Sequence, residues 1–525
     1  MKASEGLEVE KKYDVGKDAQ VPHLTDIEVV ARVGEPHTAT LTAVYFDTAA
    51  QELAGRKITL RRRTGGADAG WHLKLPPAAA AGSEPAARRE LHAPLGQEGV
   101  VPDALLTYVQ VYLRGAAVAP VVRLETVRTT YPLYAADGQH LADLADDHVS
   151  SERLGTALAA EATNHSDASL QWREWELELV HGEPSLFAAA EEVLEAAGAT
   201  PSAHASKLGR ALGSGPTSAR RRAPGTASLL AGKKAPAAAV VTLYVAEHVD
   251  HILALDPAVR LAEPDAVHDL RSATRRLRSV LTAYRSLYSA VRVRRLLAEL
   301  KWLGGELGAP RDAEVMAAIL RGPLAALPDD AGSQAVRRRV HRHTEAVFTA
   351  GYRELLAALV SGRYFRLLDE LESFRTDPPL RAVAVVSGRK ATGKAIEKSA
   401  ARLRRSHRAA ATSRKGPERD EALHQVRKDA KRLRHVAESA VPVHGKRAAK
   451  VGKAAQRQQA HLGEFNDAVL ASGLLASLRQ ANDQPQVVAA FDALVEEQAA
   501  LMVAALAKYR RARKKSRHLL GRGII

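Results

Sequence analysis

The chain has 525 residues, which is too long for one ordinary domain and long enough for two substantial cores. With 46% hydrophobic and 26% charged residues it falls in the globular range, which excludes a wholly disordered or fibrous protein. Because the sequence contains no cysteine, disulfide scaffolds, thiolate zinc sites, iron–sulfur clusters and cysteine nucleophiles are excluded as well.

No apolar run approaches the ~20 residues needed to cross a bilayer, and the segment from Met1 to Glu5 does not begin a signal peptide. The sequence therefore predicts a soluble, cytoplasmic protein without a membrane partner.

The charge is divided unevenly along the chain. Residues 1–210 contain 20 Lys and Arg residues against 30 Asp and Glu residues, a net charge of −10. Residues 211–525 contain 56 against 30, a net charge of +26, which brings the whole chain to +16. A basic field of this size concentrates polyanions around the protein, although it does not by itself specify which polyanion.

Residues 1–210 predict an antiparallel, mainly β domain with a few helices. Short alternating segments at 7–13, 57–63, 71–75 and 172–179 are separated by Gly, Pro and Asp clusters, and the clearest helix spans 185–197. In several segments one face is charged at every position, while the other carries Leu, Val, Ile and Trp. A sheet packed on its apolar face would expose these charges to solvent, whereas a closed barrel could direct them inward, where they would line a polar lumen.

The first alternating segment contains Glu8-x-Glu10-x-Lys12, which places two carboxylates and an ammonium on one strand face in steps of about 6.5–7 Å. Adjacent carboxylates repel unless a cation lies between them, so this spacing suits a divalent metal bound through oxygen. Taken alone, the triplet also fits a solvated strand face. Further charged residues that would share the inside of a barrel are Arg61, Arg63, Lys74, Arg88, Glu90, Arg123, Arg128, Asp143, Asp146, Asp147, Glu174, Glu176 and Glu178.

Such a lumen implies a highly charged ligand, because unpaired buried charges are costly. A chain of phosphates with bound Mg²⁺ or Mn²⁺ meets this requirement, since Arg and Lys bind phosphoryl oxygens and carboxylates bind the metal. Phosphoryl transfer depends on positioning and charge neutralisation more than on covalent chemistry.

An ordered set of motifs in this half resembles a known family. The motifs are Glu8-x-Glu10-x-Lys12, Tyr45-Phe46-Asp47-Thr48, Leu60-Arg61-Arg62-Arg63, Leu73-Lys74-Leu75-Pro76, Arg88-x-Glu90, Glu174-x-Glu176-x-Glu178 and Ser206-Lys207-Leu208. Over roughly residues 5–212 they resemble the CYTH family, the triphosphate tunnel metalloenzymes. The resemblance implies an eight-stranded antiparallel tunnel that hydrolyses triphosphate compounds with a divalent metal.

The resemblance also implies residue roles. Metal-side carboxylates are expected at Glu8, Glu10, Glu174 and Glu176, which together with Lys12 form the expected catalytic set. Phosphate-binding cations are expected at Lys12, Arg61, Arg63, Lys74 and Arg88. Lys207 resembles the lysine on the helix that plugs one tunnel end and is expected to bind phosphate as well.

Two positions depart from the family pattern. Where the family often has Lys-x-Arg before an aromatic residue, Thr126-Val127-Arg128 before Tyr131 supplies only the arginine. We assign Arg123 and Arg128 to phosphate binding. Among Asp143, Asp146 and Asp147, we assign Asp146 to the metal.

Residues 213–236 predict a flexible basic linker, because this segment is rich in Gly, Ser, Ala, Pro and Arg and lacks periodicity. From 237 to 520 the apolar period becomes helical. An internal repeat runs through this half: the motif from His268 to Arg278 returns from His424 to Arg434 at an offset of 156, and the motif from Leu307 to Asp312 returns from Leu462 to Asp467 at an offset of 155. The repeat predicts two similar four-helix bundles, at 237–380 and 381–520.

Each repeat carries a basic stripe about 80° wide along one helix. Like charges so close on a helix destabilise it, so a polyanion ligand explains them better than solvation alone. The two copies resemble the CHAD family, which implies two bundles around a basic groove that binds inorganic polyphosphate. The implied groove residues are His268, Arg271, Arg275, Arg278, His424, Arg427, Lys428, Lys431 and Arg434, with His435 close by and Asp312 and Asp467 orienting the cations.

The combined prediction is a multidomain α+β protein with a CYTH-like tunnel at 5–212 and a CHAD-like helical domain at 237–520. It predicts metal-dependent hydrolysis of tripolyphosphate or short-chain polyphosphate, with Mg²⁺ or Mn²⁺ as cofactor. Tethering the domains would raise the concentration of chain ends near the tunnel or recruit the enzyme to polyphosphate granules.

Three alternatives stay open. The protein could only bind polyphosphate, the tunnel could act on nucleoside triphosphates or cyclise them as some CYTH members do, or the basic half could bind nucleic acid. The last is disfavoured because aromatic residues make up only 4% of the chain and show no stacking pattern.

Overall fold

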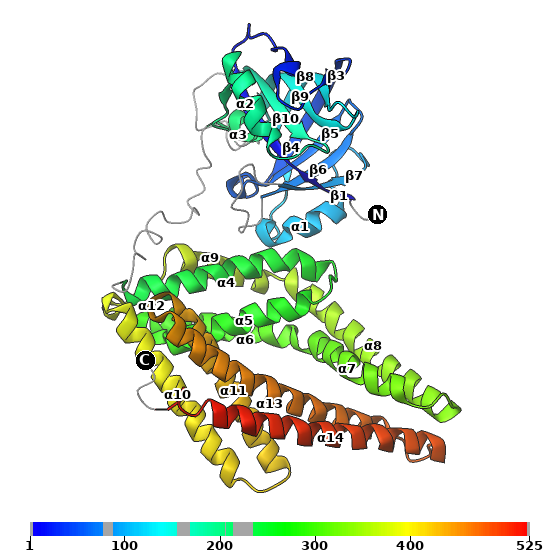
Figure 1. The fold of residues 1–525 in the computed structure, drawn as a ribbon, viewed down its shortest axis with the longest axis vertical. Coiled ribbons are helices and arrows are strands. Elements are labelled where there is room, and N and C mark those ends of the chain that lie inside the picture. The colour runs from blue at the N-terminus through cyan, green and yellow to red at the C-terminus, as the bar shows by residue number, and fades with distance from the viewer. Residues whose placement is uncertain (1–3, 77–87, 155–168, 205, 214–234, 522–525) are drawn as a thin grey trace. The chain divides into compact units, whose positions relative to one another are not determined.

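The computed structural model describes residues 4–76, 88–154, 169–204, 206–213 and 235–521. The chain divides into two compact units between Arg220 and Arg221. This point lies within the predicted linker, whose residues 214–234 are outside the described part. Figure 1 shows a mainly β unit in the first part of the chain and an all-helical unit in the second.

The N-terminal unit is built on one curled antiparallel sheet (Figure 1). Its strands are β1 (Ser4–Glu8), β2 (Glu10–Val15), β3 (Arg32–Val33), β4 (His37–Asp47), β5 (Thr59–Thr64), β6 (Gly70–Leu75), β7 (Arg88–Ala93), β8 (Ala119–Tyr134), β9 (His140–Arg153), β10 (Leu170–Leu179) and β11 (Thr200–Pro201). Their order is β1-β7-β6-β5-β4-β8-β9-β10-β2-β11, with β3 beside β8. Only Val9 separates β1 from β2, so a single stretch of chain pairs with β7 through its first half and with β10 through its second.

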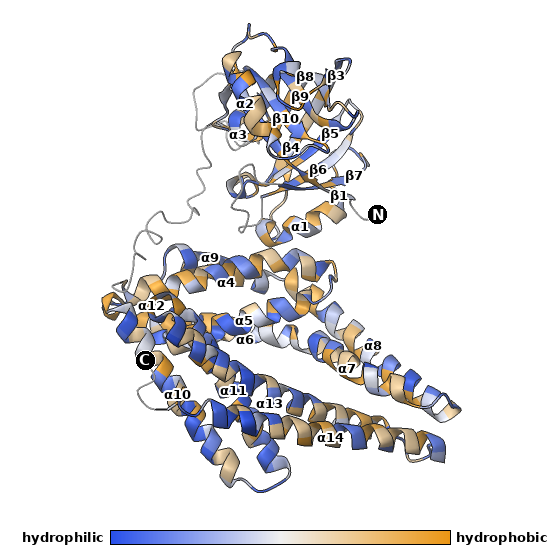
Figure 2. Ribbon diagram, in the orientation of Figure 1, coloured by the Kyte–Doolittle hydropathy of each residue, from blue (hydrophilic) through white to orange (hydrophobic). Residues whose placement is uncertain are grey.

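Apolar side chains cover one face of this sheet and form its cores. Leu60, Trp71, Leu73 and Leu91 pack with α1 (Asp103–Leu113), and a second cluster around Trp175 packs with α2 (Leu186–Ala196). Figure 2 shows hydrophilic and hydrophobic residues interleaved along the strands. Because successive side chains of a strand point to opposite faces, the charged members of the same strands are left on the other face.

The C-terminal unit is all-helical. Its first half contains α4 (Ala237–Arg260), α5 (Ala266–Ala283), α6 (Ala290–Glu306), α7 (Gly308–Ala326), α8 (Ala331–Leu359) and α9 (Gly362–Thr376). Its second half contains α10 (Gly388–Thr412), α11 (Pro417–Ser439), α12 (Val441–His444), α13 (Lys446–Leu478) and α14 (Pro485–Lys515). The prediction of four helices in each half is thus coarser than the structure, which has six and five in the described residues.

The repeat is visible in the packing of these helices. In the first half α4 packs on α5 and α7 packs on α8. In the second half α10 packs on α11 and α13 packs on α14. The basic helices α5 and α11, one from each half, also contact each other. An apolar cluster that includes Leu320, Val340, Leu475 and Phe491 joins the α7–α8 pair to the α13–α14 pair.

One local difference between the repeats has a clear cause. In the first repeat the helix is interrupted at Leu307, between α6 and α7. Pro310 lies in the first turn of α7, where its missing N–H costs nothing. The matching position of the second repeat is Phe465, and α13 continues through it as one helix of 33 residues. Proline thus splits one long helix into α6 and α7.

Helix α4 is long and apolar enough to cross a membrane by length and composition alone, which the sequence prediction did not anticipate. Half of its most apolar stretch is buried within the structure, and Val241, Val245 and Val249 are fully enclosed. These contacts are those of a core helix of a globular domain.

Candidate functional site

The charged face of the sheet encloses a cavity of about 100 Å³. Twelve of the residues predicted for the tunnel line it: Glu8, Glu10, Lys12, Arg61, Arg63, Lys74, Arg88, Glu90, Arg128, Glu176, Glu178 and Lys207. They come from seven strands and from the short helix α3 (Lys207–Ala211). The structure therefore brings acids and bases from distant parts of the sequence into one space.

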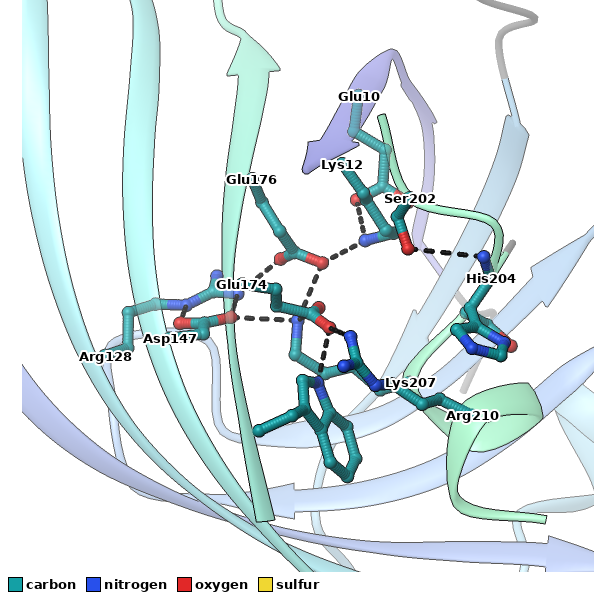
Figure 3. Close-up of polar contacts among 12 residues, drawn as sticks. Glu10, Lys12, Arg128, Asp147, Glu174, Glu176, Ser202, His204, Lys207 and Arg210 are labelled. Carbon is teal, nitrogen blue, oxygen red and sulfur yellow. Dashed lines mark hydrogen bonds and ion pairs between the residues drawn. The ribbon is translucent and has the colours of Figure 1, made fainter. Parts of the chain in front are cut away.

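At one end of this cavity, an acid cluster of Asp147, Glu174 and Glu176 surrounds the ammonium of Lys207 (Figure 3). The three carboxylates offer oxygen atoms within 4.8 Å of one another, and all three side chains are buried. The Nζ atom of Lys207 lies 2.8, 2.7 and 2.6 Å from their oxygens, respectively. Arg128 also binds Asp147 through two hydrogen bonds, of 2.7 and 2.6 Å.

The local structure explains why Lys207 reaches the acid cluster. The Ser206 side chain accepts a hydrogen bond from the backbone N–H of Gly209 and so caps the start of α3. One turn later, Arg210 pairs with Asp14 of β2 at 2.5 Å. These two contacts fix α3 against the sheet with Lys207 directed inward.

The ionisation of this cluster is set by mutual pairing. Burial opposes the charged form of Asp147, but Lys207 and Arg128 outweigh it and hold the pKa of that carboxyl below its ordinary value. Burial likewise opposes ionisation of Glu176, yet Lys12, Lys207 and Arg128 keep its pKa well below the usual range. The pKa of Lys207 is well above normal, because the three acids outweigh its burial. Asp147, Glu176 and Lys207 are therefore charged at neutral pH.

The acids of the first strand are also paired with lysines. Glu8 accepts a hydrogen bond from Lys74 at 2.5 Å, and Glu10 accepts one from Lys12 at 2.8 Å. Burial raises the pKa of Glu8, and burial together with the charge of Glu8 raises the pKa of Glu178 to about 7. Glu8 and Glu178 thus hold protons more readily than Asp147 and Glu176, whereas Lys12 and Lys74 outweigh the burial of Glu10 and lower its pKa.

The assignment of Asp146 to the metal is not what the structure shows. Asp146 lies opposite Trp175 in the sheet, whereas Asp147 lies opposite Glu174. Its carboxylate binds Arg173 through two hydrogen bonds of 2.8 Å each and accepts a third, of 3.2 Å, from Trp175. Because neighbouring residues of a strand point to opposite faces, Asp147 takes the inward position and Asp146 belongs to the outer face.

The assignment of Arg123 to phosphate binding is corrected for the same reason. Arg123 and Arg128 are five residues apart in β8, so they point to opposite faces. The Arg123 side chain is 45% exposed and pairs with Glu152 at 2.9 Å, outside the cavity.

Asp68 and Tyr45 line the cavity, although no role was predicted for either of them from the sequence. Asp68, in the turn before β6, lines the cavity and forms an ion pair with Arg63. Tyr45 lines it as well, and its hydroxyl accepts a hydrogen bond from Arg61 at 3.4 Å. Tyr45 lies directly opposite Arg61 in the β4–β5 register. Pairing these two strands in the sequence would therefore have identified Tyr45 as a neighbour of Arg61.

The acid cluster fits a divalent metal ion. Its three carboxylates supply the hard oxygen donors that Mg²⁺ and Mn²⁺ bind, from strands that hold them close together. In the sequence-based metal set, Glu174 and Glu176 belong to this cluster, while Glu8 and Glu10 lie with Lys74 and Lys12.

Lys207 occupies the position that such a metal would take, so the two cations compete. We expect Lys207→Met, which removes the ammonium but keeps the length of the side chain, to raise the affinity for Mn²⁺ by about tenfold or more. Isothermal titration with Mn²⁺ in the absence of substrate measures this. Lys11→Met is the control, because Lys11 pairs with Glu191 outside the cavity. Equal Mn²⁺ affinity in the two variants would contradict the competition.

The helical unit contains a second, larger cavity of about 650 Å³, which we call the groove. It lies where the repeats meet, and α5, α7, α8, α11 and α13 all contribute to it. The predicted residues that line it are His268, Arg271, Arg275, His424, Arg427 and Lys431. Asp312 and Asp467 line it too, and Asp312 pairs with Arg271 at 2.8 Å.

Three predicted groove residues, Arg278, Lys428 and Arg434, do not line it. The Lys428 side chain is 47% exposed, and Arg434 is bound to Glu438 one turn further along α11 at 2.7 Å. His435 is almost completely buried, and burial holds its pKa well below the usual range, so it is a neutral core residue.

The groove cations repel one another. Burial and the neighbouring Arg275 and Arg427 lower the pKa of Lys431 to about 7, and burial with Arg271 and Arg427 lowers the pKa of Arg275 to about 10. An anion in the groove would relieve this repulsion and raise both pKa values.

This repulsion makes anion binding depend on pH. The free protein loses the Lys431 proton near pH 7, whereas a bound phosphate chain would retain it, so binding takes up a proton. We expect polyphosphate affinity to fall by up to about tenfold between pH 6 and pH 8, as measured by titration at constant ionic strength. Lys431→Arg, which stays protonated, should flatten the profile, and an unchanged profile in this variant would contradict the assignment.

Comparisons with known proteins identify both domains of the chain. A CYTH domain model matches residues 6–211, and a CHAD domain model matches residues 243–476. An uncharacterized protein of Mycobacterium tuberculosis is 39% identical over 475 residues, which cover 88% of this chain and 87% of the relative.

Solved structures show weaker likeness. PptA from Streptomyces chartreusis is 18% identical with a TM-score of 0.46, and the match covers 53% of this chain and 99% of PptA. The CHAD domain from the plant Ricinus communis is 24% identical with a TM-score of 0.42, covering 54% of this chain and 92% of that domain. The two domain matches confirm both resemblances, and the chain belongs to the family of proteins that join a CYTH domain to a CHAD domain.

Proposed function

We propose that the N-terminal unit hydrolyses inorganic triphosphate or short-chain polyphosphate in a metal-dependent reaction, and that the helical unit binds inorganic polyphosphate. The observation that carries the proposal is the single cavity in which a row of Arg and Lys side chains lies beside buried carboxylates. A phosphate chain with a divalent metal supplies the charge that both groups require.

The sheet is the wall of a tunnel in this proposal. If Ser4–Val15 is counted as one bent strand, it joins the β7 edge to the β10 edge, and with β4 to β10 it makes eight long strands. A closed wall of this size leaves an interior wide enough for side chains and one small ligand. Helix α3 then closes part of one end with Lys207.

Binding and chemistry divide among the lining residues. Arg61, Arg63 and Lys74 are placed to bind phosphoryl oxygens and to neutralise the charge that accumulates on the leaving phosphate. A Mg²⁺ or Mn²⁺ ion held by the acid cluster would supply Lewis-acid polarisation of the phosphoryl oxygens. A remaining carboxylate of the cavity, Glu8, Glu10 or Glu178, would orient the attacking water.

The apo cavity is already internally paired, and substrate has to exchange these pairs. Asp68 forms an ion pair with Arg63, and Glu8 forms one with Lys74. A metal ion bound by the acids and phosphoryl oxygens bound by the bases would each replace a protein partner with a ligand partner. Binding of metal and of phosphate is therefore expected to be mutually dependent.

The helical unit contributes binding without chemistry in this proposal. Its groove carries five Arg and Lys residues and is large enough for several phosphoryl groups. Because both units recognise the same polymer, tethering raises the local concentration of chain ends for the tunnel.

A substrate panel tests the proposal. Whole-chain protein is incubated with tripolyphosphate, long-chain polyphosphate or ATP in Mg²⁺, Mn²⁺ or EDTA, and orthophosphate, pyrophosphate and cyclic AMP are measured. We expect orthophosphate from tripolyphosphate that depends on metal. Binding of polyphosphate without any turnover would reduce the protein to a binding module, and cyclic AMP from ATP would identify a cyclase instead.

A further inference from the structure

Two stretches of the helical unit contain no acidic residue at all. Residues 439–463, which include the start of α13, carry five Lys and Arg residues, and residues 498–525, which include the end of α14, carry eight. Helices α13 and α14 pack against each other along their length. Their basic ends therefore form one strongly cationic region that the groove does not use.

A cavity of about 130 Å³ lies between these helix ends. It is lined by Lys450, Lys453, Ala454, Arg457, Ala512, Lys515, Ser516 and Leu519. The side chains of its four cations are exposed, and the ion pairs found among the described residues include none of them. We call these four cations, Lys450, Lys453, Arg457 and Lys515, the α13–α14 basic surface.

Hydrogen bonds join the helices beside this surface. Buried Gln458 donates a hydrogen bond of 2.8 Å to Ser516, the residue that ends α14, and its amide oxygen lies 2.9 Å from Nε2 of His407 on α10. Ser516 in turn donates to the carbonyl of Ala512 at 2.8 Å. Three helices are thus held together directly beneath the exposed cations.

The spacing of the cations is unfavourable without a ligand. Lys450 and Lys453 are three residues apart, and Lys453 and Arg457 are four apart, so they neighbour one another on the helix surface. Like charges at these spacings repel and destabilise a helix. A polyanion that contacts all of them would remove this repulsion.

The surface is separate from the groove. The two share no lining residue, although α13 contributes to both. Along α13, Lys450 precedes the groove residue Asn466 by 16 residues, which corresponds to about 24 Å of helix. A long phosphate chain can extend over such a distance, whereas tripolyphosphate cannot.

We propose that the α13–α14 basic surface is a second binding site for long-chain polyphosphate. This rests on the proposed function, in which the helical unit binds that polymer. Nucleic acid is disfavoured as the ligand because no aromatic side chain lines the cavity, and single-stranded nucleic acid is held by stacking on such side chains. A flexible chain of phosphates needs only clustered cations.

The test compares three variants of the whole chain in EDTA, where the polymer is not consumed. The surface variant replaces Lys450, Lys453, Arg457 and Lys515 with Gln. The control variant makes the same charge change at Arg294, Lys301, Arg338 and Arg353, which are exposed and line none of the three cavities. The groove variant replaces Arg275, Arg427 and Lys431 with Gln. Thermal unfolding verifies that each variant is folded.

Affinity for long-chain polyphosphate is measured over a range of salt concentrations. We expect the surface variant to bind at least about tenfold more weakly than the control, with a slope of log affinity against log salt that is smaller by about 3, since each lost phosphate contact removes about 0.7. Tripolyphosphate binding should not distinguish the surface variant from the control.

The possible failures are separable. If the groove variant loses affinity while the surface variant matches the control, the proposed function stands and the second site is wrong. If the wild-type chain binds no polyphosphate, both are wrong. Single-stranded DNA of matched charge is tested as a competitor. If it displaces polyphosphate from the wild type, and if the surface variant loses more affinity for the DNA than for polyphosphate, the surface is a nucleic-acid site and the inference is overturned.

Discussion

Asp147→Asn is expected to lower metal-dependent phosphate release by roughly 10²–10³-fold, a loss typical of removing one electrostatic contact to a transition state. Asp147 is fully buried and is one of three carboxylates that surround Lys207. Asparagine keeps the shape of the side chain but removes one of the anionic oxygen donors. The remaining acids then hold a divalent cation more weakly, and Arg128 loses its bidentate partner.

Asp146→Asn is the matched control, because it makes the same chemical change at the adjacent residue. Asp146 binds Arg173 on the outer face of the sheet, so the variant breaks a buried ion pair and should lower the free energy of unfolding by up to about 3 kcal/mol. Its kcat at a temperature well below the unfolding transition should stay near the wild-type value. Phosphate-release assays and thermal unfolding of both variants separate the two effects. A larger loss of kcat in Asp146→Asn would restore the sequence-based assignment.

Lys431→Glu is expected to weaken polyphosphate binding by roughly 10²-fold, because it removes one charge-assisted contact and neutralises its neighbours. The new carboxylate would lie beside Arg275 and Arg427, whose positive charges add to burial in lowering the pKa of Lys431 to about 7. It would form ion pairs with them and leave fewer cations for phosphate. Since the same change relieves repulsion, the melting temperature should stay equal to that of the wild type or rise.

Lys428→Glu, one turn earlier on the same helix, controls for the change in net charge. Lys428 was predicted to line the groove but is half exposed outside it. Its reversal should alter polyphosphate affinity by no more than a surface charge does, about twofold to threefold at physiological salt. Titration calorimetry with long-chain polyphosphate checks both variants. Similar losses at the two positions would mean that the polymer follows the whole stripe of α11 and not the groove.

Strand alternation allowed much of the tunnel to be predicted from the sequence. A face that is charged at every position, opposite a face of Leu, Val and Trp, predicts a polar interior, and Arg61, Lys74 and Glu176 do line one cavity. The error at Arg123 was avoidable, because its odd separation from Arg128 already places the two on opposite faces. The choice among Asp143, Asp146 and Asp147 required the register of β9 against β10, which depends on pairing between distant segments.

The helical half shows a different limit. The repeat and the basic stripe predicted α5 and α11. A stripe on one helix does not predict where another helix packs against it, and so does not predict which of its residues line the groove. Only the N-terminal part of each stripe lines the groove, so Arg278 and Arg434 are left outside. Figure 2 shows much of α11 as hydrophilic, and hydropathy alone therefore did not distinguish groove from solvent. The ion pairs of Lys207 and Asp68 likewise depend on a short helix and a turn that have no periodic signal.

The most direct test of the tunnel proposal is to locate the metal. A crystal of the whole chain soaked with Mn²⁺ and a non-hydrolysable triphosphate analogue would give anomalous scattering at the ion. We predict a peak bounded by Asp147, Glu174 and Glu176, with the Lys207 ammonium displaced from the acids and the analogue against Arg61 and Arg63. A peak beside Asp146, or an analogue bound with Lys207 still among the three carboxylates and no ion near them, would contradict the account.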